Sequence, residues 1–182
     1  KRPRLHEVLP ISPTTLVGRK DELIELANLL ADPACRLVTL IGPGGIGKTR
    51  LALASAAQEA DVFQDGVIFV DLSGATSPGF LAETMLKALD VPLAGPQNPS
   101  QQLRSYLKDL EMLVVLDGYD HVLPDIELLA ELLRFAPHVA WIVTSRERLA
   151  LQVEQLVEVV GLNYPKGDPL DLSVGIDAIA AE

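Results

Sequence analysis

The chain of 182 residues carries 25 acidic and 15 basic side chains, which gives a formal net charge of −10. Its 48% of hydrophobic residues excludes a disordered chain and is sufficient for one domain with a substantial core. The negative charge excludes broad electrostatic attraction to nucleic acid or to an anionic membrane, so we expect no direct nucleic-acid binding by this segment.

The sequence also indicates a cytoplasmic protein without a membrane partner. No apolar run approaches the roughly 18 residues needed to cross a bilayer. The basic residues 1–4 lack the apolar stretch of a signal peptide and indicate a solvated linker, or else a localisation or nucleic-acid patch. Cys35 has no second cysteine to pair with, which favours a reducing compartment, and we expect it to be a small core residue.

The first half of the chain alternates between helix and strand patterns. Residues 1–15 hold three prolines and little periodicity, so we expect an extended N-terminal arm. The expected elements that follow are a helix over 20–31, a strand over 36–41, a helix over about 48–60 and a buried strand over 66–72.

The second half continues the alternation. A helix is expected over 77–90, with Ser77 as its cap and Pro78 in its first turn, and a proline-rich loop over 91–100. The remaining elements are a helix over 100–110, a strand over 111–117, a helix over 124–136, a strand over 138–146 and a strand over 154–162 that alternates as an edge strand does.

Strands that alternate with helices and are apolar on both faces are typical of a parallel sheet covered by helices on both sides. We therefore expect an α/β fold with one domain over 16–164 and a separate C-terminal tail over 165–182. The chain begins at Lys1 without a methionine, and we expect it to be part of a longer protein. In such sheets ligands bind at the carboxyl ends of the strands.

The segment GPGGIGKT, residues 42–49, fits the phosphate-binding pattern G-x-x-x-x-G-K-[ST] between a buried strand and a helix. Glycines let the backbone N–H groups turn toward phosphate oxygens, Lys48 reaches the β- and γ-phosphates, and the Thr49 hydroxyl binds Mg²⁺. The alternative is a glycine-rich turn without a ligand. The predicted phosphate-side residues are Pro43, Gly44, Gly45, Ile46, Gly47, Lys48, Thr49 and Arg50.

Asp117 ends the third buried strand, where a P-loop protein places an aspartate that binds Mg²⁺ directly or through one of its ligands; the alternative is a helix cap. Gly118 stands where many ATP-hydrolysing P-loop proteins have a second acid. Asp120 is the nearest acid, but in an extended chain its side chain would point elsewhere. Asp120 and His121 are therefore equally open to a catalytic role and to a role as turn residues.

Arg146 ends the fourth strand and is a candidate sensor of the γ-phosphate through charge-assisted hydrogen bonds. The alternative is a surface arginine paired with Glu147 or Glu154. Thr144 and Ser145 precede it and are candidates to hold a water molecule.

Five segments carry a recognisable pattern: TLVGRKDELIEL (15–26), VTLIGPGGIGKTRLAL (38–53), GVIFVDL (66–72), LVVLDGYDHVL (113–123) and WIVTSRERL (141–149). Together they resemble the nucleotide-binding domain of the STAND-class P-loop ATPases, of the NB-ARC-like type in bacterial transcriptional and signalling regulators. The resemblance covers roughly residues 10–165. It implies an ASCE-type P-loop core with a five-stranded parallel sheet ordered 5-1-4-3-2.

The resemblance also implies site roles. Val17, Gly18 and Arg19 become base-side contacts of an adenine nucleotide, Asp117 the Mg²⁺ aspartate and Arg146 the sensor arginine. The tail over 165–182 becomes the start of a following helical domain, and the wider chain is expected to hold a winged helix and helical repeats.

The implied function is an ATP/ADP-binding switch that requires Mg²⁺, belongs to a larger regulator and forms homo-oligomers on activation. The family group usually reads LDNFEH where this chain reads LDGYDH (116–121), so we expect weak ATPase activity at most in isolation. Two alternatives remain: an autonomous P-loop ATPase or kinase with efficient turnover, and an interaction scaffold that has lost nucleotide.

Overall fold

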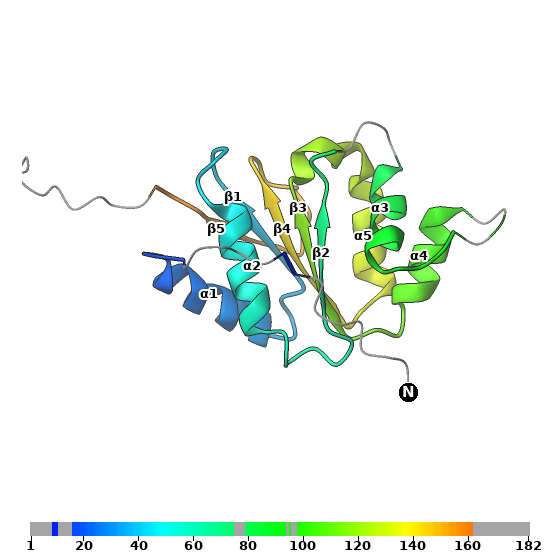
Figure 1. Cartoon of the computed structure of the whole chain (residues 1–182), viewed down its shortest axis with the longest axis horizontal. Helices are drawn as coiled ribbons and strands as arrows, with labels where there is room; N and C mark the ends of the chain where they lie inside the picture. The colour runs from blue at the N-terminus through cyan, green and yellow to red at the C-terminus, as the bar shows by residue number, and fades with distance from the viewer. Residues whose placement is uncertain (1–8, 11–15, 75–78, 94, 96–97, 162–182) are drawn as a thin grey trace, which may run out of the picture.

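The computed structural model describes residues 9–10, 16–74, 79–93, 95 and 98–161, and places a five-stranded sheet between two helical layers (Figure 1). The strands are β1 (Leu37–Ile41), β2 (Val67–Asp71), β3 (Met112–Asp117), β4 (Val139–Ser145) and β5 (Glu154–Glu158). Their order is β2-β3-β4-β1-β5, and all neighbouring strands are parallel. The expected α/β fold, the sheet order and the edge position of the last strand are confirmed.

The helices divide between the two faces of the sheet. Helices α1 (Lys20–Ala31) and α2 (Lys48–Gln58) cover one face, where Cys35 is buried in the core that they share with β1. Helices α3 (Phe80–Ala88), α4 (Pro99–Leu107) and α5 (Ile126–Phe135) cover the other face (Figure 1). Strands buried on both faces explain why their sequences are continuous apolar runs.

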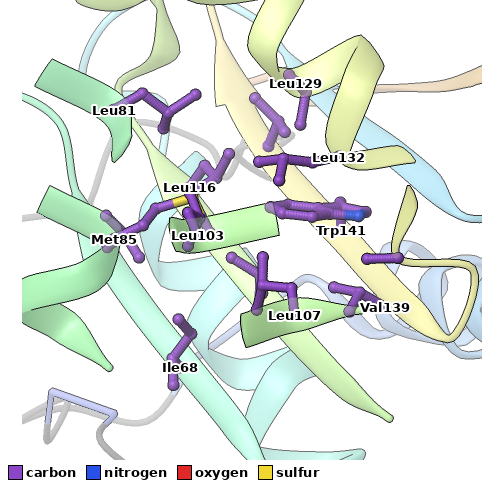
Figure 2. Close-up of a cluster of buried hydrophobic side chains, with 14 of the residues drawn as sticks. Ile68, Leu81, Met85, Leu103, Leu107, Leu116, Leu129, Leu132, Val139 and Trp141 are labelled. Atoms are coloured by element: carbon purple, nitrogen blue, oxygen red, sulfur yellow. The ribbon is translucent and has the colours of Figure 1, made fainter. Parts of the chain in front are cut away.

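The core beneath α3, α4 and α5 is built around Trp141 of β4, whose side chain is fully buried. Figure 2 shows this side chain beside Leu132 of α5, with leucines of α4 and Met85 of α3 completing the layer. This packing fixes the three central strands, and therefore fixes the positions at which they end.

Several helix boundaries differ from the sequence expectation. α4 covers Pro99–Leu107 rather than the expected 100–110, and it begins one residue early because the Asn98 side chain accepts a hydrogen bond from the N–H of Ser100 (2.9 Å). α5 begins at Ile126, after a 3-10 helix η1 (Tyr119–Asp125) with a kink at Val122. Ser77, Pro78 and the tail 165–182 lie outside the described residues, as does most of the N-terminal arm.

α3 is capped from a distance. The Asp125 carboxylate accepts hydrogen bonds from the N–H groups of Gly79 (2.8 Å) and Leu81 (3.2 Å) at the start of this helix. Asp125 is 46 residues from Gly79 in the sequence, so no local pattern could reveal this cap. Within the described residues, no helix combines the length and the apolar character needed to cross a membrane.

Candidate functional site

Three central strands end side by side at one edge of the sheet. β4 lies between β1 and β3, so the loop after β1 meets the residues that end β3 and β4. This edge is the carboxyl edge of a parallel sheet, where ligands bind in α/β proteins. The phosphate-loop, Asp117 and Arg146 predictions therefore concern one place in the fold.

Two glycines give the loop its shape. A Cβ on Gly42 would stand 2.6 Å from the carbonyl oxygen of Val159, so only glycine fits the close approach of the segment after β5. Gly47 has a φ of +101° and directly precedes Lys48, the first residue of α2. The loop thus leads into a helix N-terminus, whose free N–H groups and positive dipole end favour an anion.

Lys48 carries positive charge into this loop. Its Nζ donates hydrogen bonds to the carbonyl oxygens of Gly42 (2.7 Å) and Pro43 (2.9 Å). Lys48 is half-buried, whereas Arg50, two residues further on in α2, is exposed. The loop therefore combines N–H donors with a cation, which is the chemistry that polyphosphates require.

Asp117 joins three elements at the floor of the site. Its Oδ1 accepts hydrogen bonds from the hydroxyl of Thr49 at the start of α2 (2.7 Å) and of Thr144 at the end of β4 (2.6 Å). The Thr144 hydroxyl in turn accepts a hydrogen bond from the N–H of Gly118 (2.9 Å). The Thr144 hydroxyl therefore links Asp117 to the backbone of the following residue.

Thr49 and Asp117 fit a magnesium ion. Mg²⁺ prefers oxygen ligands, and adjacent ligands of its octahedron lie about 2.9 Å apart. The Thr49 hydroxyl and the Asp117 carboxylate are both oxygen donors and stand 2.7 Å apart beside the phosphate loop. A bound Mg²⁺ would supply charge neutralisation for the phosphates there.

Asp120 lies at the end of β4 rather than pointing away. Gly118 takes a φ of +77° and starts the η1 turn, so the chain after Asp117 is not extended. The Asp120 Oδ1 accepts hydrogen bonds from the Ser145 hydroxyl (2.8 Å) and the Arg146 N–H (2.6 Å). The glycine after Asp117 was the available signal for this turn, since glycine adopts positive φ without strain.

Arg146 extends over the phosphate loop. Its Nη2 lies 3.9 Å from the position that a Cβ on Gly44 would occupy. Its Nε stands 3.7 Å from the Asp120 Oδ2, and the arginine side chain is 67% exposed. The Glu154 carboxylate, one of the expected partners, instead accepts hydrogen bonds from the N–H groups of Leu149 and Ala150.

Arg19 is buried beside the loop, with 5% of its surface exposed. Its guanidinium donates to the Glu22 carboxylate (2.7 Å) and to the carbonyl oxygen of Ile46 (3.1 Å). The family resemblance implied a base-side role for Arg19 and gave no sign of the Ile46 contact, which joins residues 27 apart. Val17 and Gly18 are exposed at the same end of α1.

The Arg19–Glu22 pair also shifts a pKa. Burial acts to raise the pKa of the Glu22 carboxyl, but the hydrogen bond from Arg19, the residue's own backbone N–H and the arginine charge together hold it below its usual value. Glu22 is therefore ionised at neutral pH, and it balances the buried guanidinium.

The family assignment rests on residues 32–151, which match the AAA domain and make up more than half of the chain. The chain belongs to the AAA domain family. It is an AAA-type P-loop domain, and this family in general binds nucleotide with Mg²⁺. The matched segment contains the phosphate loop, Asp117 and Arg146, and begins after Arg19.

Curated relatives of this AAA domain include regulators. It is 38% identical over 162 residues to the uncharacterized protein Rv0894 of Mycobacterium tuberculosis, covering 88% of this chain and 40% of the relative. It is 39% identical over 120 residues to the putative HTH-type transcriptional regulator Rv0890c of the same organism, covering 65% of this chain and 13% of the relative. It is 31% identical over 152 residues to the regulatory protein AfsR of Streptomyces griseus, covering 78% of this chain and 15% of the relative. The chain thus spans less than half the length of each.

Solved structures share the fold of this AAA domain. The ORC2 protein of Aeropyrum pernix, solved in ADPNP–ADP complexes, matches with a TM-score of 0.56 at 18% identity, over 84% of this chain and 50% of that one. The STAND protein PH0952 of Pyrococcus horikoshii, which has a tetratricopeptide repeat sensor, matches with a TM-score of 0.56 at 21% identity, over 87% and 25%.

Proposed function

We propose that this AAA domain is the ATP/ADP-binding switch module of a larger STAND-type signalling or transcription regulator, dependent on Mg²⁺ and slow or inactive in hydrolysis alone. The observation that carries the proposal is the Arg146 guanidinium, which lies beside Gly44 over the phosphate loop. A cation in that place meets the γ-phosphate of ATP but has no such partner in ADP.

Different residues of the site would contact different phosphates of the nucleotide. The loop N–H groups and the N-terminus of α2 hold the β-phosphate, and Lys48 reaches from the loop to the β- and γ-phosphates. Thr49 and Asp117, whose side chains stand 2.7 Å apart, would hold Mg²⁺. Arg146 then reports whether a γ-phosphate is present, and Val17 and Gly18 border the base.

Slow hydrolysis follows from the environment of Asp120. A general base must be free to accept a proton from the attacking water. The Asp120 carboxylate already accepts from the Ser145 hydroxyl and the Arg146 N–H, and it pairs with the Arg146 guanidinium. Gly118 takes the place of a second acid directly after Asp117, and the imidazole of His121, the other candidate, lies against it, with Cδ2 3.6 Å from the position of a Cβ on Gly118. The case for slow hydrolysis therefore rests on the engaged carboxylate of Asp120.

A switch requires that two conformations bind the nucleotides differently. A ligand with equal affinity for both states shifts neither, so the difference must come from γ-phosphate contacts such as that of Arg146. The names of the regulator relatives, and the small share of each that this chain spans, support a place within a longer regulator. In that chain we place the nucleotide-binding domain over 16–164, followed by a helical domain, a winged helix and helical repeats, with homo-oligomers on activation and a cytoplasmic location.

The proposal is tested by calorimetric titration of ADP and ATP with Mg²⁺, followed by a phosphate-release assay on the same samples. We expect both nucleotides to bind, and Lys48→Ala to abolish or greatly weaken that binding. Lys87→Ala is the matched control, because Lys87 is exposed on α3 in the opposite helical layer and should leave affinity unchanged. Rapid phosphate release would instead favour an autonomous ATPase.

A further inference from the structure

We propose that Arg19 is a positioning residue for the phosphate loop: its guanidinium fixes the Ile46–Gly47 peptide so that the Gly47 N–H faces the phosphate. This role rests on the nucleotide binding proposed above and differs from a contact with the base. It makes the first residue before α1 part of the phosphate site, although Arg19 lies outside the segment that matches the AAA domain.

The contact is a buried bridge between two segments. Arg19 is 5% exposed, and its two terminal nitrogens bind different partners: Glu22 on the first turn of α1 and the carbonyl of Ile46 in the loop. A buried guanidinium is costly unless it is paired and hydrogen-bonded, so both contacts are needed to keep it in place. With these nitrogens engaged and little surface exposed, Arg19 offers little to a base.

The geometry of the peptide gives the bridge its consequence. In a trans peptide the carbonyl of one residue and the N–H of the next point in opposite directions. The Ile46 carbonyl accepts the hydrogen bond from Arg19, so the N–H of Gly47 points away from Arg19. Holding the carbonyl therefore aims one N–H donor at the place where a phosphate binds.

The Gly47 carbonyl beyond this peptide accepts the N–H of Leu51 (3.0 Å), whereas the contact that the Ile46 carbonyl makes is the one with Arg19. Gly45 and Gly47 have φ values of +75° and +101°, and a Cβ on either would meet no atom within 4 Å. The side chain of Ile46 packs against the core beneath α1 and α2, but that contact does not determine where its carbonyl points. The hydrogen bond from Arg19 is thus the contact that selects one orientation of a peptide flanked by flexible residues.

The bridge also ties the loop to α1. Arg19 is the cap residue of this helix, and its carbonyl accepts the N–H of Leu23 (3.1 Å). A movement of α1 would therefore carry the guanidinium with it and release or rotate the Ile46–Gly47 peptide.

The first test compares ligands that share phosphates but not the base. Arg19→Gln should weaken ADP and inorganic tripolyphosphate by a similar factor, about tenfold. The preference for ADP over GDP should stay as in the wild type. The affinities of Arg19→Lys for ADP and tripolyphosphate should lie between those of the wild type and those of Arg19→Gln. A loss for ADP with unchanged tripolyphosphate affinity, or a changed ADP-to-GDP ratio, would overturn the proposal in favour of base contact.

The second test needs no nucleotide. Millisecond amide hydrogen exchange should become faster in residues 44–48 of Arg19→Gln and remain unchanged elsewhere. The matched control is Arg104→Gln, which removes a salt bridge of similar length to Glu131 (2.8 Å) far from the loop, between α4 and α5. Unchanged exchange in the loop, or an increase spread over the whole domain, would overturn the proposal.

The two tests also separate this inference from the proposed function. If the wild type binds neither ADP nor tripolyphosphate, the nucleotide-binding proposal fails. The exchange comparison still decides whether Arg19 holds the loop.

Discussion

Asp117 illustrates how a single oxygen can organise a site. Its Oδ1 accepts hydrogen bonds from the hydroxyls of Thr49 and Thr144. Thr49 belongs to α2 and Thr144 to β4, and both are distant from Asp117 in the sequence. The same arrangement brings a carboxylate, a hydroxyl and the phosphate loop into one corner. The sequence predicted Asp117 and Thr49 as site residues, but it did not predict Thr144 as a hydrogen-bond partner of Asp117.

Asp120 is expected to act through Arg146. Asp120→Ala removes the acceptor for the Arg146 N–H and for the Ser145 hydroxyl, and it frees the guanidinium that lies over the loop. ATP affinity should fall about fivefold and ADP affinity should change little, as measured by calorimetry. In a double-mutant cycle with Arg146→Ala the two losses should be less than additive. Full additivity would show that the two residues act independently.

Glu22 should make stability depend on pH. Its folded-state pKa lies below the usual value of 4.5, so its contribution is complete above that value and is lost as the pH falls through the lower folded-state pKa. Urea unfolding of the wild type and Glu22→Gln should therefore differ most near neutral pH and converge in acid. A difference that stays constant from pH 7 to pH 3 would mean that the charge of Glu22 does not support Arg19.

At the scale of elements, four of the five strands were predicted to within one residue at each end, whereas the strand expected over 154–162 ends at Glu158. β1, β3 and β4 are buried on both faces, so their apolar runs identify them directly. Helix ends depend on caps, and the cap of α3 is supplied by Asp125, which follows Gly79 by 46 residues and ends η1. The contacts that the sequence did not reveal also join distant residues. Arg19 and Ile46 are 27 residues apart, and Asp120 and Arg146 are 26 residues apart.

The distant cap of α3 should contribute measurably to stability. Asp125 is 9% exposed and satisfies two N–H groups, so Asp125→Ala should lower the free energy of unfolding by about 1–2 kcal/mol. Asn98→Ala is the comparison, because it removes a local and exposed cap of α4 and should cost about 0.5–1 kcal/mol. Urea unfolding measures both. A smaller loss for Asp125→Ala than for Asn98→Ala would contradict this assignment.

At the scale of the whole molecule, the alternation of strands and helices predicted a parallel sheet, but not which strands are neighbours. The order came from the family resemblance, and the structure has that order. The order matters because it sets β4 between β1 and β3, which brings Arg146 to the loop and Asp120 to Arg146. Function at this site is therefore a property of the topology as much as of the motif.

The central claim is that the domain distinguishes ATP from ADP through Arg146. The most direct measurement is the ratio of ATP to ADP affinity, with Mg²⁺, in the wild type, Arg146→Ala and the exposed neighbour variant Arg148→Ala. We expect Arg146→Ala to lose about tenfold in ATP affinity, to keep ADP affinity within about twofold, and Arg148→Ala to resemble the wild type. Equal losses for both nucleotides in Arg146→Ala would contradict the claim and leave Arg146 with a structural role.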